Sequence, residues 1–152
     1  MERWCGALSQ PAIRPGAAYR YEFPLRQRGT FLDHPYADEM TQMALGMVGM
    51  TVVHPRDPGH RPVDRDFSLM VHEWRIDPGA SRPDPTEMTD FNVLTFNCRC
   101  FPGTAPLVAR RGDRVRLRFG NLGAMEHHPI HLHGCAFLLT ATEGGDIPES
   151  AQ

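Results

Sequence analysis

Four of the eight histidines fall within seven positions of the sequence, at His127, His128, His131 and His133. Imidazole is a common ligand of copper, zinc, iron and nickel, and such density indicates a metal site. On a strand that starts at Ile130, His131 and His133 would share one face with their Cα atoms about 6.6 Å apart, within reach of one ion or two adjacent ions. His128 precedes Pro129, which favours extended backbone and lets this histidine address a separate site. The spacing does not choose among the metals.

Other groups have weaker claims to a metal. A stack of solvated histidines is the alternative to a metal site, but alternating, Pro-anchored histidines in an apolar segment argue against it. Cys98 and Cys100 could bind Cu(I) through soft thiolates, yet on a strand they are equally two small apolar residues on one face. Four methionines have helical spacing, which favours packing over a Cu(I)-binding surface. They are Met40, Met43, Met47 and Met50.

The elements that would position these residues are mostly short strands. Apolar and polar residues alternate over 19–25, which predicts a half-buried strand, at an edge because of Pro24. The apolar spacing of 38–45 predicts one short helix, with Asp38 as its N-terminal cap. The turn-rich segment 55–64 indicates a linker, and a second unit is expected to start near Arg65.

Strands and turns at this spacing are typical of an all-β sandwich. The predicted strands are 50–53, 67–76, 91–96, 107–109, 113–119 and 130–142.

Composition argues against several classes of partner. A net charge of −2 with 22% charged residues gives no reason to expect nucleic acid or an anionic membrane as partner. No segment approaches the length that crosses a bilayer, and residues 1–10 lack the features of a secretory signal. The four cysteines are too scattered to indicate a disulfide framework, so they do not identify a compartment.

Five segments resemble, in order, landmarks of bacterial laccase-like multicopper oxidases. The most specific is His-Pro-Ile-His-Leu-His-Gly at 128–134, which matches the third of the four histidine motifs of that family. The others are Gly-Thr-Phe-Leu-Asp-His-Pro-Tyr at 29–36, the Met-rich segment 38–50, Phe-Pro-Gly-Thr at 101–104 and 112–121. The first motif, His-x-His-Gly, would precede residue 1 and the fourth, His-Cys-His, would follow residue 152. We therefore expect a chain truncated at both ends.

The resemblance implies a set of copper ligands. In the family the motifs bind a type 1 blue copper and a trinuclear cluster. His128 matches a type 1 ligand, while His131 and His133 match ligands of the type 2 and type 3 coppers. His34 matches the first histidine of the second motif, but its partner position holds Tyr36, whose phenol, with a pKa of about 10, is a poor substitute.

The resemblance also implies an architecture. It is a cupredoxin-like Greek-key β-sandwich in two partial domains, 1–54 and 65–152, joined by the linker 55–64. His128 follows His34 by only 94 residues, too few for the middle domain of a three-domain laccase. The chain thus resembles the two-domain type, a homotrimer in which first-domain histidines of one chain meet second-domain histidines of the next. The family is periplasmic or secreted.

The implied activity is copper-dependent oxidation of phenolic, aromatic-amine or metal-ion substrates coupled to reduction of dioxygen to water. With two motifs absent, we expect little or no oxidase activity from this chain alone. The alternative is a non-catalytic copper- or zinc-binding fragment. Cupins also carry His-x-His on a strand, but the Glu expected about four residues later is absent from 136–138. Copper nitrite reductases place a blue-copper Cys in the first domain, and none follows Gly29 there.

The cysteines generate a spectroscopic prediction. Copper-loaded protein should show no intense blue absorption, because that band needs a thiolate ligand beside histidines and no cysteine here is flanked by them. The visible spectrum after addition of Cu(II) measures this. An intense blue band that disappears in Cys135→Ser or in the Cys98→Ser/Cys100→Ser double variant would show that a cysteine binds the copper.

Overall fold

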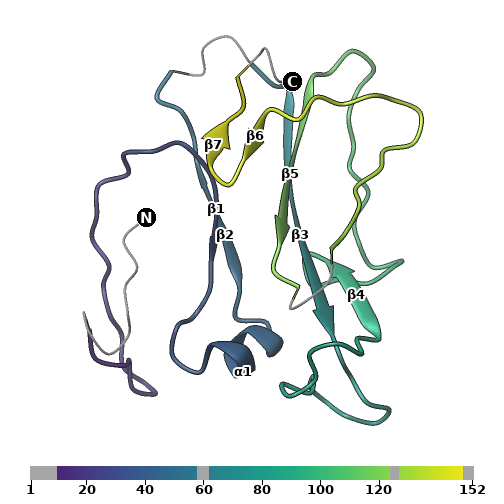
Figure 1. Cartoon of the computed structure of the whole chain (residues 1–152). Helices are drawn as coiled ribbons and strands as arrows, with labels where there is room; N and C mark the ends of the chain where they lie inside the picture. The colour runs from purple at the N-terminus through teal and green to yellow at the C-terminus, as the bar shows by residue number, and fades with distance from the viewer. Residues whose placement is uncertain (1–9, 58–61, 124–126, 149–152) are drawn as a thin grey trace.

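The computed structural model describes residues 10–57, 62–123 and 127–148, and this part of the chain is mostly β-structure with one short helix (Figure 1). The described residues form three small sheets, ordered β1-β2, β4-β3-β5 and β6-β7. The elements are β1 (Gly29–Asp33), α1 (Glu39–Ala44), β2 (Gly49–Val53), β3 (Arg65–Trp74), β4 (Val93–Phe96), β5 (Val115–Asn121), β6 (Ala141–Thr142) and β7 (Gly145–Asp146).

β1 and β2 form an antiparallel pair with α1 in the connection between them. The predicted helix and the strand after it are confirmed. Asp38, however, does not cap the helix with its side chain. It adopts a left-handed conformation with φ 49°, and its backbone carbonyl accepts a hydrogen bond from the Gln42 amide instead. The helix therefore starts from a tight turn of the backbone.

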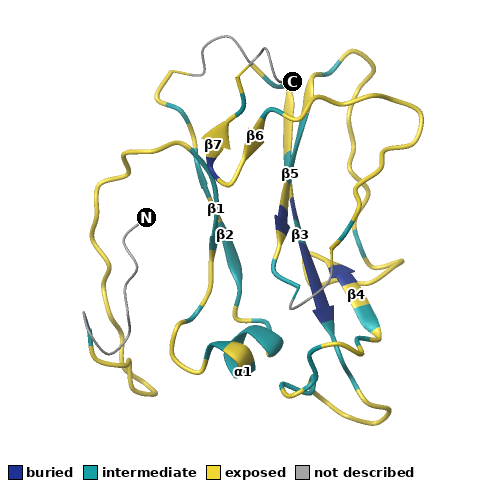
Figure 2. Cartoon of the chain, viewed as in Figure 1, coloured by how far each residue is buried: buried dark blue, intermediate teal, exposed yellow. Residues whose placement is uncertain are grey.

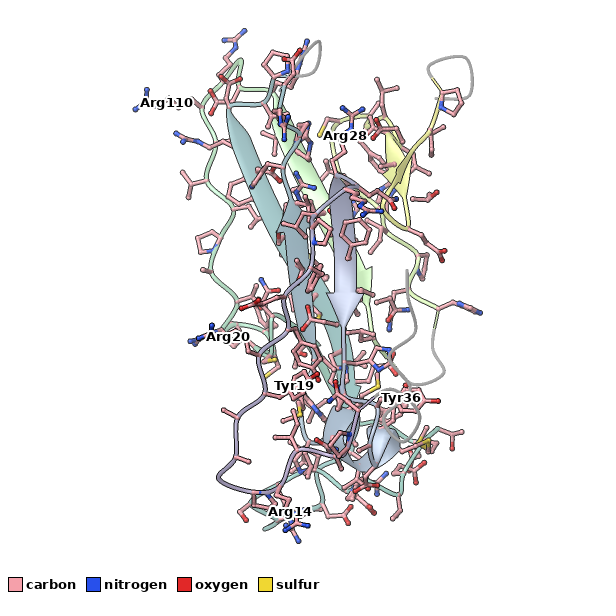
Figure 3. All side chains as sticks on the ribbon, turned by 90° about the vertical axis from the view of Figure 1, so that its left-hand side faces the viewer. Arg14, Tyr19, Arg20, Arg28, Tyr36 and Arg110 are labelled. Atoms are coloured by element: carbon pink, nitrogen blue, oxygen red, sulfur yellow. The ribbon has the colours of Figure 1, made fainter. Side chains whose placement is uncertain are left out.

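The strand predicted over 19–25 is wrong. This segment pairs with no strand in the described structure and runs along the outside of the molecule (Figure 1). Its apolar side chains remain open to solvent, with Phe23 and Leu25 each 64% exposed. Arg14 and Arg20 project outward from the same N-terminal segment (Figure 3). Alternation produces a strand only where a neighbouring strand supplies hydrogen bonds, and none lies beside this segment among the described residues.

β3 is the central strand of the largest sheet. It pairs antiparallel with β4 and parallel with β5, so both of its edges are covered. Its second half is the most buried part of the structure, with Leu69, Val71, His72 and Glu73 buried (Figure 2). Thr95 of β4 is buried beside them and donates its hydroxyl hydrogen bond to the His72 carbonyl, at 3.0 Å. The predicted strands in 67–76, 91–96 and 113–119 are thereby confirmed.

Arg118 of β5 links β5 to strands of both larger sheets. Its Nε and Nη2 donate to the two carboxylate oxygens of Asp66 on β3, each at 2.7 Å, and its Nη1 donates to Thr30 Oγ1 on β1 at 2.7 Å. Burial alone would raise the pKa of Asp66, but the hydrogen bond and charge of Arg118, with further charges nearby, hold that pKa below its ordinary value. Gly120 on the same strand leaves room for the side chains of Leu32 and Met50, which a Cβ there would meet at 2.6 and 2.7 Å.

Two predicted strands of the second half of the chain, 107–109 and 130–142, are wrong. Residues 107–109 are irregular, and of 130–142 only Ala141–Thr142 (β6) is a strand. Apolar side chains of the irregular part, including Leu138 at 69% exposed, face solvent. The short β6-β7 turn is held to the start of β1, because Gln27 donates a hydrogen bond to the Gly144 carbonyl and Arg28 pairs with Asp146.

The apolar core is thin. Met40 and Met47 are 55% and 58% exposed, so the expectation that they fill a core is wrong for these two, whereas Met50 lies against Gly120. The chain of 17.1 kDa exposes 12266 Å², compared with about 7,700 Å² for a compact monomer of this mass. Much of its apolar surface is therefore uncovered. The described residues include no helix with the length and apolar character needed to span a membrane.

Arg118 and Arg116 provide a matched stability test. Arg118→Ala should lower the free energy of unfolding by about 3 kcal/mol, because Asp66 would keep its charge without its two-point partner. Arg116 approaches Asp66 only to 3.4 Å, so Arg116→Ala should cost no more than about 1 kcal/mol. Urea unfolding of both variants and the parent chain measures the difference.

The pH dependence of that effect has a definite sign. A lowered pKa of Asp66 means that its contribution is present above the ordinary value of 3.8 and is lost as the pH falls through the folded-state value. The gap between Arg118→Ala and the parent should thus shrink in acid. An equal cost for Arg116→Ala, or a gap independent of pH, would contradict the role given to Arg118.

Candidate metal centre

His131 and His133 lie side by side. Their ring centroids are 4.7 Å apart and their planes cross at 86°. Both residues are exposed and belong to an irregular segment that turns at Gly134, which has φ 85°. The structure thus brings the two rings together, but through a turn and not through the face of a strand as the alternation predicted.

His128 is held in a different environment, against the central strand. Its side chain is 22% exposed, and its Nε2 lies 2.5 Å from Oε1 of Glu73, whose side chain is completely buried. The contact does not meet hydrogen-bond geometry. Nε2 of His128 and Oε1 of Glu73 are therefore buried without a hydrogen bond within the described part of the chain. The close contact still pairs the imidazole with the carboxylate, which matters because a buried carboxylate without a partner is costly.

Glu73 is the residue near this motif that the sequence reasoning missed. It stands in an apolar stretch of β3, between His72 and Trp74. A buried charge in such a strand needs a partner, and this could have been taken as a signal. The partner could not be identified from the sequence, because His128 lies 55 residues further along the chain.

His72 shows a second buried imidazole. Its Nδ1 donates to the Leu122 carbonyl at 2.8 Å, and its ring lies 4.8 Å from that of Trp74 in an edge-on arrangement. Its Nε2 is buried without a hydrogen bond among the described residues. Since side chains alternate along a strand, His72 and Trp74 occupy the face opposite to Glu73. His72 is thus directed away from the contact between Glu73 and His128.

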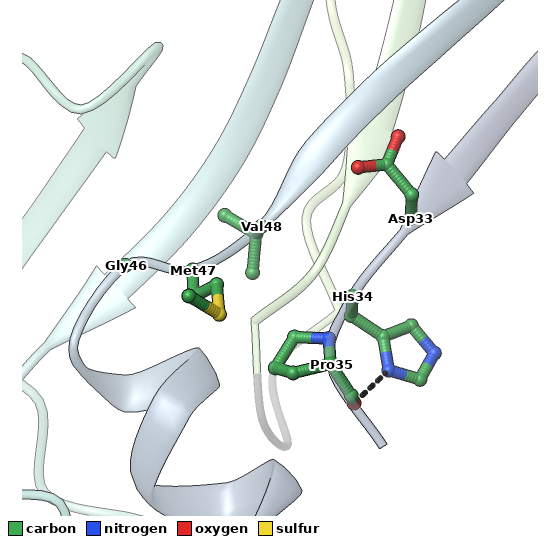
Figure 4. A pocket seen from close by; sticks show the side chains of 6 residues that line it. All are labelled: Asp33, His34, Pro35, Gly46, Met47 and Val48. Atoms are coloured by element: carbon green, nitrogen blue, oxygen red, sulfur yellow. Dashed lines mark hydrogen bonds between the residues drawn. The ribbon is translucent and has the colours of Figure 1, made fainter. Parts of the chain in front are cut away.

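His34 lies at the end of β1, beside an open pocket (Figure 4). Its Nδ1 donates to the Pro35 carbonyl at 3.0 Å and also lies 3.1 Å from Glu39 Oε1. The proton on Nδ1 leaves Nε2 as the nitrogen that can bind a metal. Tyr36, at the partner position, is 57% exposed. The pocket is lined by Asp33, His34, Pro35, Gly46, Met47 and Val48.

The four predicted metal ligands do not lie together at one site within the described part of the chain. They are His34, His128, His131 and His133. No group of three histidine, cysteine or acidic side chains that could hold a metal occurs there. The cysteines do not supply such a group either, since Cys98, Cys100 and Cys135 are exposed free thiols. Cys98 has φ 61° in a turn after β4. It therefore does not share a strand face with Cys100, although the sequence allows both residues to lie on one strand.

Comparisons with known proteins identify the family. Two models described as multicopper oxidase match the sequence, one over residues 77–152 and the other over residues 5–58. The chain belongs to the multicopper oxidase family. Multicopper oxidase domains have the cupredoxin fold, so the all-β, cupredoxin-like class expected from the sequence is confirmed.

Several curated proteins are similar to this multicopper oxidase chain. Copper resistance protein A of Pseudomonas syringae pv. tomato is 22% identical over 90% of the chain and 30% of its own length. Multicopper oxidase MmcO of Mycobacterium tuberculosis is 28% identical over 88% of the chain and 29% of its own length. A copper-containing nitrite reductase of Neisseria meningitidis is 25% identical, over 93% and 39%. The chain spans about a third of the length of these relatives. No solved structure gives a significant match.

The donors present are of a kind that suits copper. Imidazole is among the ligands that copper prefers, and the adjacent rings of His131 and His133 are open to an ion from solvent. Two imidazoles do not complete a copper site, so water or further side chains must fill the other positions. The multicopper oxidase chain therefore offers a partial set of ligands.

Removing the adjacent pair should weaken copper binding. In the His131→Ala/His133→Ala double variant the affinity for Cu(II) should fall at least about tenfold, which is about 1.4 kcal/mol, because both open imidazoles are lost. Isothermal titration with Cu(II) measures it. His127→Ala is the control, because it removes an exposed histidine of the same segment outside the motif. Equal affinity for the double variant and the parent would refute the assignment.

Proposed function

We propose that this chain supplies copper ligands to a laccase-like multicopper oxidase of the two-domain type. In the proposal His128 binds the type 1 copper, His131 and His133 bind coppers of the trinuclear cluster, and His34 binds the cluster from the first domain. The observation that carries it is the pair of adjacent rings, 4.7 Å apart, within the motif 128–134 of a chain that belongs to the multicopper oxidase family. That motif places two kinds of imidazole, one anchored and two open, within six residues.

The proposed domains are 1–54 and 65–152, with 55–64 as the linker. This division is supported by the two family matches, which leave only 59–76 between them, and by the start of β3 at Arg65. The two parts would pack through β1 and β5, where Arg118 binds Thr30. Such packing would place the open end of β1, with His34, at a fixed position relative to the second domain.

When bound, copper would supply the electron-transfer chemistry that links oxidation of a phenolic, aromatic-amine or metal-ion substrate to reduction of dioxygen to water. The residues of this chain hold and orient it. His131 and His133 present open nitrogens on a turn, and His34 offers Nε2 because its Nδ1 proton is bound by Pro35 and Glu39.

Completion of the cluster by another subunit is part of the proposal. Within the described part of the chain, no third metal-binding side chain joins His131 and His133. Both histidines are exposed. A copper ion bound to them would therefore be accessible to ligands from a neighbouring chain. A homotrimer that joins the first domain of one subunit to the second domain of the next would supply them.

A non-catalytic copper- or zinc-binding role is the second candidate. It is favoured by Tyr36, which replaces a cluster ligand, and by the incomplete ligand set among the described residues. Oxygen consumption by the copper-loaded chain with a phenolic reductant separates the two candidates only if further ligands are supplied. The ligand substitution at position 36 offers a more direct test.

Tyr36→His should restore the pair of histidines flanking Pro35 and raise the affinity of the His34 region for Cu(II). We expect a gain of at least about tenfold at that site, since a second imidazole replaces a protonated phenol. Isothermal titration of the His131→Ala/His133→Ala background isolates this effect. Tyr21→His is the control, because it also exchanges an exposed tyrosine for a histidine, but outside the segment 29–36 that contains His34. No gain over this control would contradict the assignment of His34.

A further inference from the structure

The contact between β3 and the copper motif assigns a role to Glu73. Resting on the proposed function, we propose that Glu73 is a positioning residue that holds His128 through Nε2, so that Nδ1 is the only ring nitrogen left to bind the metal. Glu73 would touch neither the metal nor the substrate. It would act by fixing the orientation and the tautomer of the His128 ring, as carboxylates commonly do for metal-binding histidines.

The position of Glu73 suits a rigid support. It lies near the end of the central strand, paired with Leu94 of β4 on one side, and its side chain has no exposed surface. The chain that leaves β5 closes over the carboxylate. At Gly123 a Cβ would lie 3.0 Å from both Cδ and Oε1 of Glu73, so the backbone passes directly against the carboxylate group. The Gly123 amide is itself fixed by a hydrogen bond to Asn121 Oδ1 at 2.9 Å.

The chemistry of the contact selects one nitrogen of His128. An ionised carboxylate only accepts hydrogen bonds, so a hydrogen bond across the 2.5 Å contact with Glu73 requires the proton on Nε2 of His128. In a neutral imidazole the other nitrogen then holds the lone pair. Within the described part of the chain, no hydrogen bond or ion pair engages Nδ1 of His128. That nitrogen remains available as a ligand.

His34 shows the opposite arrangement and provides an internal comparison. There the proton is on Nδ1, between the Pro35 carbonyl and Glu39, and Nε2 is left open. The two predicted ligands of different copper sites are therefore oriented by different neighbours through different nitrogens. In the structure this choice depends on the side chain or carbonyl that contacts each ring.

The tautomer of His128 tests the proposal without copper. Two-dimensional long-range ¹H–¹⁵N spectra of the ¹⁵N-labelled full chain at neutral pH distinguish the two neutral forms of each histidine. His128 should be protonated on Nε2 in the parent and in Glu73→Gln, since a carboxylate oxygen and an amide oxygen can both accept a hydrogen bond from that nitrogen. In Glu73→Leu, which has no acceptor, His128 should show a mixture of the two forms. An unchanged His128 tautomer in Glu73→Leu would overturn the proposal.

Copper added to the same samples separates this inference from the proposed function. Stepwise Cu(II) broadens the signals of the histidines that bind it, and His131 and His133 serve as references within the same molecule. In Glu73→Leu, broadening of His128 should require about tenfold more Cu(II) relative to these references, with recovery in Glu73→Gln. Because the ratio is internal, a general loss of stability does not imitate it.

Each outcome has a separate meaning. If His131 and His133 do not broaden in the parent, the proposed function fails. If they broaden and His128 responds equally in the parent and Glu73→Leu, the role of Glu73 alone fails. If Glu73→Leu does not fold, Glu73→Ala, which also lacks an acceptor, replaces it: a mixture of the two forms of His128 supports the positioning role, and an unchanged Nε2 tautomer overturns it.

Discussion

The structure depends most on the interaction of Arg118 with Asp66 and Thr30. Arg118 joins β5 to β3 through two hydrogen bonds to one carboxylate and joins β5 to β1 through a third. With its side chain only 11% exposed, this cation is much less screened than an ordinary surface arginine. In a chain with so little buried apolar surface, the stability of the fold depends strongly on such a contact between strands.

The histidine motif 128–134 is positioned by the strand register that this interaction supports. Ser68 of β3 lies opposite Arg118, and Val71 lies opposite Asn121, so the chain leaving β5 passes beside the end of β3. Glu73 thereby lies against Gly123 and, a few residues further on, against His128. A shift of the register by one residue would turn Glu73 to the opposite face of the sheet and remove the contact. The position of Glu73 within β3 thus determines the orientation of the His128 ring.

One short motif provides two different environments for imidazole. His128 lies against a buried carboxylate, whereas His131 and His133 stand on an exposed turn where only their own rings adjoin. A buried contact fixes one ring before any ion arrives, which reduces the ordering needed on binding. The ring nitrogens of the exposed pair remain open to a metal ion, which could take its other ligands from outside the chain. This difference is consistent with the proposal that the histidines of the motif serve separate copper sites.

Much of the fold followed from the sequence, and the failures share a physical cause. The helix and the strands β2 to β5 were found because their apolar spacing coincides with real pairing partners. The segments 19–25 and 130–140 have equally suitable patterns but no neighbouring strand among the described residues, and alternation does not reveal that. For the site, the motif predicted that His131 and His133 are close together, but Glu73 was missed because its partner is determined by the register of β3 and β5.

In the proposed function, the exposed imidazoles of His131 and His133 bind a copper ion directly. Pulsed electron paramagnetic resonance of the full chain with less than one equivalent of Cu(II) counts the imidazoles bound in the plane of the ion. We expect two in the parent, one in His131→Ala and one in His133→Ala, because the rings lie side by side on one turn. A spectrum that keeps two imidazoles in both variants would show that copper binds elsewhere, and would contradict binding by His131 and His133.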